Sequence, residues 1–180
     1  MIAPAPAAER EALTFFLAAQ RASVLEIVDG LAEDQMSRTV LPSGWTLAGM
    51  IEHLGDAERV WFQFVVANEP TDDKDHARAD VERLDAAASN GFRPRRSVAE
   101  ALSYYRAQTV RSDEILAAKS LDARPAARPV ADIGIADDVL TVRDVVMHVI
   151  EETARHAGHL DVAREPVSYT HLTLPTNREV

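Results

Sequence analysis

The segment TVRDVVMHVIEETARHAGHLDVARE, Thr141 to Glu165, carries the pattern that decides the fold class. Its apolar residues recur every three or four positions, as they do on one side of an amphipathic α-helix. It opens with Thr-x-x-Asp, Thr141 to Asp144, a variant of the capping box that starts many helices. The segment therefore predicts a long helix with one face in a core. That face consists of Val142, Val145, Val146, Val149, Ala157, Leu160 and Ala163.

Three further segments show helical periodicity, at about residues 8–31, 46–68 and 97–120. The 97–120 segment opens with a capping box, Ser97 to Glu100. The first segment is expected to bury Leu13, Phe16, Leu17, Val24, Ile27, Val28 and Leu31. The second is expected to bury Leu47, Met50, Ile51, Leu54, Trp61, Phe62 and Val65. Its polar side is expected to be Glu52, Asp56, Arg59 and Gln63.

Two long connections and one shorter one join these four helices. A short helix around His76 to Ala87 is expected within the first long connection. No segment competes as a strand, so the prediction is all-α. Connections of this length favour a four-helix bundle with long crossover connections over a series of short hairpins.

The composition restricts the classes of function. A chain of 180 residues with 47 % hydrophobic residues predicts one globular domain. The net charge of −10, without a basic stripe, argues against nucleic acid and against an anionic membrane surface as partners. No signal-peptide pattern or membrane-spanning apolar run is present, so a cytoplasmic protein is expected. Because cysteine is absent, any metal must be held by His, Asp or Glu, and any thiol must come from a cosubstrate.

The C-terminal stretch PVSYTHLTLPTNREV departs in style from the rest of the chain. The run VSYTHLTLPT, Val167 to Thr176, resembles the translation of a sequencing adapter read through at a contig edge. Residues 1–166 are therefore expected to form the single domain, and residues 167–180 a non-native tail. A genuine flexible tail is the alternative.

The helix around His148 to Asp161 raises the question of a metal site. On a helical wheel His156 falls inside the apolar arc and Glu152 lies at its border, whereas Glu151 points towards water. Four residues of separation place Glu152 and His156 about 6 Å apart along the axis and about 40° apart around it. Two such side chains can converge on one ion. The alternative is an ordinary hydrogen-bonded core histidine.

The 46–68 helix adds a third candidate, His53, at the border of its apolar arc. A bundle that brings His53 against Glu152 and His156 would offer two imidazoles and one carboxylate, with coordination positions left open. Such a set suits Zn, Ni, Fe or Mn. The alternative places His53 at the rim of the bundle with its ring tip in water. Glu58 lies inside the apolar arc of the same helix, where an ion pair with Arg21 of the first helix is expected. A carboxylate that orients an imidazole is the alternative.

The blocks REALTFFLAAQRASVLEIVDGL, LPSGWTLAGMIEHLGDAERVWF and HVIEETARHAGHLDVARE carry a family resemblance. The chain resembles the DinB-like superfamily of four-helix metal-binding proteins, in an uncharacterised actinobacterial-type branch related to mycothiol-dependent maleylpyruvate isomerase. The resemblance implies one divalent metal, zinc first, held by His53, Glu152 and His156. His159 and then His148 are the substitutes if Glu152 is not a ligand.

Superfamily members with known activity are mostly thiol-dependent transferases or isomerases. The resemblance thus implies a metal-dependent S-transferase or isomerase that uses a mycothiol- or bacillithiol-type thiol and a small-molecule substrate, with a homodimer possible. Arg93, Arg95 and Arg96 are available to line a thiol pocket. Two alternatives stay open: a metal-binding or stress-linked module without catalysis, and a structural bundle whose histidines are satisfied in the core.

Overall fold

A computed structural model describes residues 6–42, 44–69, 94–127 and 139–168, and this part of the chain is helical with no strand. The elements are α1 (Pro6–Val28), α2 (Glu33–Ser37), α3 (Leu47–Glu58), η1 (Arg59–Val66), α5 (Val98–Ala118) and α6 (Val142–Ser168). The all-α prediction is therefore confirmed. The four predicted helices correspond to α1, to α3 together with η1, to α5 and to α6, with ends that agree within three residues.

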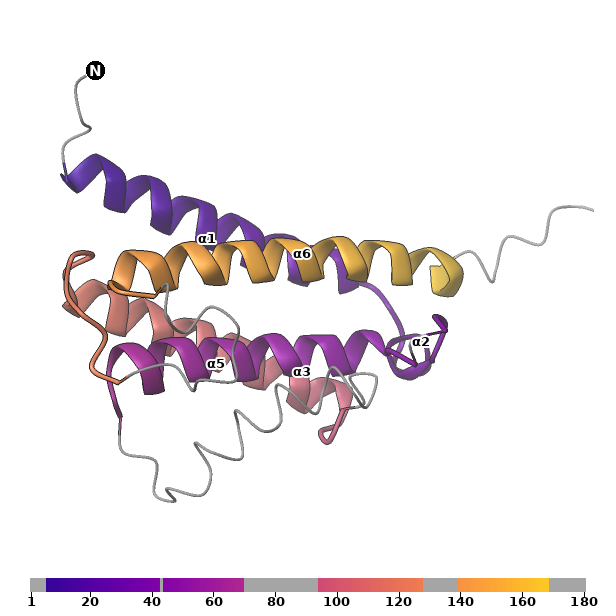
Figure 1. The fold of residues 1–180 in the computed structure, drawn as a ribbon. Helices are drawn as coiled ribbons and strands as arrows, with labels where there is room; N and C mark the ends of the chain where they lie inside the picture. Colours follow the sequence, from indigo (N-terminus) through magenta and orange to yellow (C-terminus); the bar gives the residue numbers. More distant parts are fainter. Residues whose placement is uncertain (1–5, 43, 70–93, 128–138, 169–180) are drawn as a thin grey trace, which may run out of the picture.

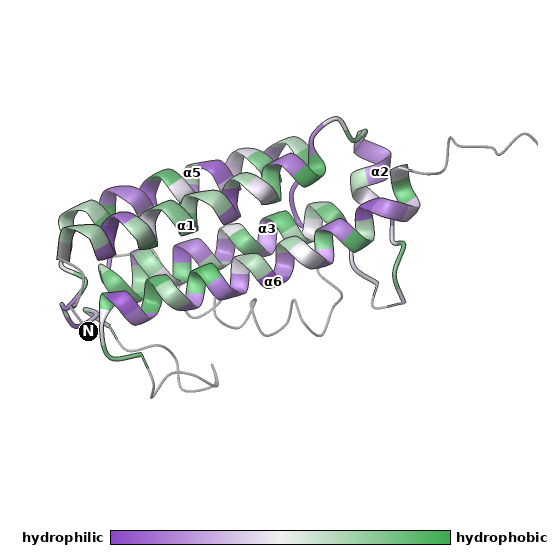
Figure 2. Cartoon of the chain, turned by 90° about the horizontal axis from the view of Figure 1, so that it is seen from above, coloured by the Kyte–Doolittle hydropathy of each residue, from purple (hydrophilic) through white to green (hydrophobic). Residues whose placement is uncertain are grey.

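The long helices pack side by side as a bundle (Figure 1). α1 and α6 lie together over α3 and α5, and α3 contacts both α5 and α6. Viewed from above, each long helix carries both hydrophobic and hydrophilic bands along its length (Figure 2). The hydrophobic bands meet in a core that includes Leu17, Leu54, Trp61, Val149 and Leu160, all at most 1 % exposed. Burial of these apolar faces is the main force that holds the bundle together.

Both predicted capping boxes are present. At the start of α5, Ser97 N donates to Glu100 Oε2 at 2.9 Å, and Glu100 N donates to Ser97 Oγ at 3.3 Å. At the start of α6, Thr141 N donates to Asp144 Oδ2 at 2.8 Å, and Asp144 N donates to Thr141 Oγ1 at 3.3 Å. These reciprocal bonds satisfy backbone donors that have no partner inside the helix.

The second predicted helix is regular only as far as Glu58. From Arg59 to Val66 the backbone winds as a π-helix, η1, which is a rare form that concentrates at functional sites. The expected apolar side of this helix is confirmed, since all seven of its predicted members are buried. η1 also presents Trp61 to α6, where its ring lies against that of His148.

Two predictions about helix faces are wrong. Phe16 is 54 % exposed, because the buried stripe of α1 runs through Leu17, Arg21 and Val24 instead. Arg21 holds a place in that stripe because its charge is matched by Glu58 of α3, as predicted. Glu52 and Asp56 were expected in solvent but are 3 % and 6 % exposed.

Close packing of α3 against α5 explains part of this burial. A Cβ atom at Gly55 would lie 2.7 Å from Cδ1 and Cε1 of Tyr104, so only glycine allows the tyrosine ring this close to α3. The Tyr104 hydroxyl donates to Asp56 Oδ1 at 2.8 Å. Helix α5 thus covers the polar side of α3 that the sequence pattern assigned to water.

One helix was not predicted, and several predictions fall wholly or partly outside the described residues. The short helix α2 was not predicted; its Met36 is 1 % exposed and joins the core. The helix expected around His76–Ala87 and most of the two long connections lie outside the described residues. The non-native tail also stays a prediction. Helix α6 includes Val167 and Ser168, with Val167 buried, and residues 169–180 lie outside the described part.

Candidate metal centre

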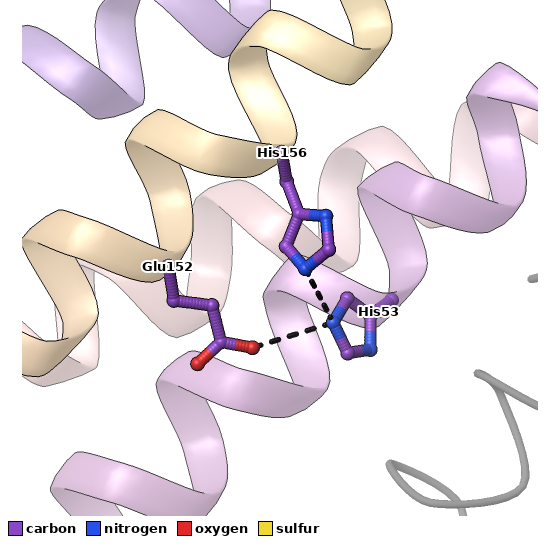
Figure 3. A group of neighbouring side chains, drawn as sticks. All are labelled: His53, Glu152 and His156. Atoms are coloured by element: carbon purple, nitrogen blue, oxygen red, sulfur yellow. Dashed lines mark hydrogen bonds and ion pairs between the residues drawn. The ribbon is translucent and has the colours of Figure 1, made fainter.

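Three predicted ligands, His53, Glu152 and His156, come together between α3 and α6. Each offers one ligand atom, and these atoms lie within 4.8 Å of one another. Glu152 and His156 extend from successive turns of α6 towards His53 on α3 (Figure 3). The His53 side chain is 7 % exposed and that of Glu152 is 18 % exposed, so the group lies at the border of the core. The alternative in which His53 points its ring tip into water does not hold.

The two separations from His53 Nε2 fit a small divalent ion. His53 Nε2 lies 3.3 Å from Glu152 Oε1 and 3.3 Å from His156 Nε2. Two ligand atoms of a tetrahedral zinc site, each about 2.0–2.1 Å from the metal, are about 3.3 Å apart. A hydrogen on His53 Nε2 points to one partner at a time and cannot serve both. A shared cation satisfies all three atoms together, so the donor set of two imidazoles and one carboxylate fits the metal that the resemblance implies.

The electrostatics of the group favour a bound cation. Burial, assisted by the neighbouring His53, lowers the pKa of His156 to about 4. Its imidazole is therefore neutral near pH 7, which is the form that binds metals. Burial alone would raise the pKa of Glu152, but hydrogen bonds and charge from His148 and His53 outweigh it and hold that pKa well below its usual range. An ionised carboxylate beside a neutral imidazole is available for coordination.

The two substitute ligands lie beside the group rather than within it. His148 Nε2 is 3.0 Å from Glu152 Oε2, and His159 Nδ1 is 3.4 Å from His156 Nδ1. Each of these histidines also contacts a tryptophan ring. Ring centroids are 4.4 Å apart for Trp61 and His148, and 4.9 Å apart for Trp45 and His159. The spacings 148/152 and 156/159 on one helix are the sequence signal for these contacts.

A second charged group forms around Glu52 and Asp56 of α3, and the sequence did not predict it. Glu52 accepts hydrogen bonds from Arg95 Nε at 2.8 Å and from Arg96 Nη1 at 2.6 Å. Arg95 also reaches Asp56, at 3.0 Å. The Arg96 guanidinium stacks over the Tyr104 ring at 3.9 Å. Arg95 and Arg96 are thus engaged by α3 carboxylates next to His53 in sequence, while Arg93 lies outside the described residues.

An ion held by three protein ligands has at least one coordination position left for another group, because zinc takes at least four ligands. A closed four-ligand set is typical of structural zinc, whereas three protein ligands and an open position are typical of catalytic zinc. Among the residues that the structure describes, the group of His53, Glu152 and His156 offers three candidate ligands, as in the second kind. It can hold a divalent ion and present it to a small molecule.

Comparison with known proteins identifies the family. The family model described as Mycothiol-S-transferase matches residues 12–168, and the chain belongs to this family. No curated protein matches the chain. In the part of the chain that the structure describes, no helix is both long enough and apolar enough to cross a membrane.

Proposed function

We propose that this member of the mycothiol S-transferase family is a metal-dependent enzyme that joins the sulfur of mycothiol to an electrophilic small molecule, or isomerises such a molecule with mycothiol as cosubstrate. The observation that carries the proposal is the convergence of His53, Glu152 and His156 within 4.8 Å, inside the region matched by the family. The absence of cysteine agrees with a thiol that is supplied from outside the chain.

In this proposal the three side chains hold one divalent ion, with zinc as the first candidate and Ni, Fe or Mn as alternatives. A bound ion would lower the pKa of a thiol in the site and favour the thiolate, which is the nucleophilic form of sulfur. The helices fix the positions of these three ligands. His53 comes from α3, and the two α6 ligands are held by their backbone spacing.

Burial around the group serves the same chemistry. The apolar neighbours on α3 and α6 include Ile51, Leu54, Val149 and Ala157, none more than 6 % exposed. A site bordered by such residues keeps bulk water away on the core side, which strengthens electrostatic interactions with the thiolate. Access for substrates is left to the solvent side, where Glu152 and His156 are partly exposed.

The first test is metal content. Full-length protein without an affinity His-tag would be analysed by elemental analysis, together with His53→Ala and His156→Ala. We expect about one divalent ion per chain in the wild type and loss of that ion in both variants. Glu151→Gln is the matched control, because Glu151 precedes Glu152 but is exposed and pairs with Arg155.

The second test is thiol transfer. The metal-loaded wild type, the two histidine variants and the control would be incubated with mycothiol and an electrophilic bimane, and S-conjugate formation followed by fluorescence. We expect metal-dependent S-conjugate formation in the wild type and in the control, and none in the two histidine variants. Stoichiometric metal without thiol-dependent turnover on any electrophile or isomerisable substrate tested would favour the metal-binding module instead. A well-folded wild type that takes up no metal after supplementation would refute the proposal.

A further inference from the structure

The two carboxylate oxygens of Glu152 have different partners. Oε1 faces the proposed metal position, at 3.3 Å from His53 Nε2. Oε2 faces the opposite way, at 3.0 Å from His148 Nε2. A carboxylate that is free to rotate can bind an ion through one oxygen or through both. The His148 contact is therefore in a position to decide between these modes.

The His148 ring is itself held in place. It belongs to α6, one turn before Glu152, and its side chain is only 19 % exposed. The His148 ring also packs against the Trp61 ring, with 4.4 Å between the centroids and an angle of 60° between the planes. Trp61 is 1 % exposed and belongs to the π-helical η1, so it is fixed by the core. A ring packed in this way cannot follow Glu152 if the carboxylate turns.

We propose that His148 is a positioning residue: its Nε2–H holds Oε2 of Glu152, so that the carboxylate offers only Oε1 to the ion and one coordination position stays open for a small-molecule ligand. This inference rests on the metal site of the proposed function. It differs from a role of His148 as a ligand, because its Nε2 points at the carboxylate oxygen that faces away from His53.

The geometry also indicates which substitution of His148 should keep the hydrogen bond to Glu152. A hydrogen-bond donor at the Nε2 position is needed, and a glutamine amide can place an N–H there, whereas leucine fills similar space without a donor. His148→Leu removes the bond and His148→Gln retains it. The matched control is Glu151→Gln, on the exposed side of the same helix turn.

The test measures metal affinity and the visible absorption of the Co²⁺-loaded full-length protein for wild type, both His148 variants and the control. The intensity of Co²⁺ absorption falls as its coordination number rises. We expect His148→Leu to weaken affinity about 10- to 100-fold, the usual effect of losing a partner of a metal ligand, and to reduce the Co²⁺ intensity. His148→Gln should restore both. Circular dichroism and thermal unfolding of the metal-free proteins check that each variant folds.

The outcomes separate the two proposals. If the wild type binds one ion and His148→Leu matches it in affinity and spectrum, the positioning role is overturned while the metal site stands. Equal losses in His148→Leu and His148→Gln, with both folded, would also overturn it, because the donor would not matter. A wild type that binds no ion overturns the metal site and this inference together. Metal binding with the expected variants but without thiol turnover would leave the positioning role in place and remove the catalytic proposal.

Discussion

Two carboxylates of this bundle, Glu58 in the interior and Glu152 at the border of the core, have partners of different kinds. Glu58 receives two N–H groups of Arg21, at 2.7 Å to Oε1 and 2.6 Å to Oε2, and the pair is almost fully buried. In the described part of the chain, Glu152 is paired with imidazoles, those of His53 and His148. A guanidinium always carries its charge and has no lone pair to give, whereas a neutral imidazole donates a lone pair to a metal.

The difference separates Glu58, an acid with a structural partner, from Glu152, an acid of the proposed metal site. The charge of Glu58 is matched within the chain. The carboxylates of Glu58 and Asp113 together outweigh burial and raise the pKa of Arg21. The group around Glu152 is complete only with a cation from outside, according to the proposed function. Substitutions in the two groups should therefore change different quantities.

The largest effect on stability is expected for Arg21→Met. It leaves Glu58 buried without its counter-charge, and breaking a buried pair in this way costs about 3–5 kcal/mol. Urea unfolding of the metal-free protein measures the change. Metal content of the folded protein should stay at the wild-type level. A destabilisation below about 1 kcal/mol, the range of exposed pairs, would contradict the role assigned to this pair.

Glu152→Gln should act mainly on metal binding. It removes a charged ligand, so the loss of affinity should exceed about 100-fold, the upper end for loss of a ligand's partner. A chelator competition titration measures the affinity. The variant should lose less unfolding free energy than Arg21→Met. Unchanged metal affinity, together with a loss of unfolding free energy as large as that of Arg21→Met, would show that Glu152 has a structural role like that of Glu58.

A smaller effect is expected for Asp144→Asn, outside both groups. Burial raises the pKa of Asp144, but hydrogen bonds from the Thr141 hydroxyl and from the N–H groups of Thr141 and Leu140 outweigh it and lower that pKa below 3.8. A depressed folded pKa adds stability above the unfolded value, and this stability is lost as pH falls through the folded value. Asparagine keeps an acceptor oxygen for these donors, so the loss is that of the negative charge at the N-terminus of α6, which should cost about 0.3–1 kcal/mol near pH 7.

Unfolding curves between pH 7 and strongly acidic pH check this prediction. The difference between wild type and Asp144→Asn should shrink as pH falls below 3.8, where the wild-type aspartate takes up its proton. A difference that stays constant with pH would show that the ionised carboxylate is not the source. Metal affinity at neutral pH should be the same in both proteins.

The smallest effect is expected for Glu151→Gln. Glu151 and Arg155 form a pair on the surface of α6, with side chains 63 % and 64 % exposed. Such pairs contribute at most about 1 kcal/mol, and often nothing measurable. Unfolding free energy and metal affinity should both remain close to wild type. A marked loss of metal affinity would contradict the distinction between Glu151 and its neighbour Glu152.

Much of the architecture could be predicted because it depends on local patterns. Helical periodicity located α1, α5 and α6, and two capping boxes marked the starts of α5 and α6. The same wheel separated Glu151 from Glu152 and put His156 towards the core. The Arg21–Glu58 pair followed from the position of Glu58 inside the apolar arc of its helix, where a carboxylate requires a partner.

Other features could not be predicted, because they depend on partners far along the chain. Glu52 and Asp56 lie on the polar side of their helix by sequence, yet they are buried in contact with Arg95, Arg96 and Tyr104. Phe16 follows the spacing of the apolar residues of its helix, yet its side chain is exposed in the bundle. The π-helical winding of η1 also breaks the regular spacing on which a helical wheel relies.

The sequence by itself determined the helical class, the helix ends and the candidate ligands on α6, since spacing along one helix fixes which side chains share a face. Only the tertiary structure decided that His53 meets Glu152 and His156 at 3.3 Å, and that His148 turns to the outer oxygen of Glu152. The physical reason is that helix packing sets distances between helices. A periodic pattern gives the direction in which a side chain points, but not the atom that it meets.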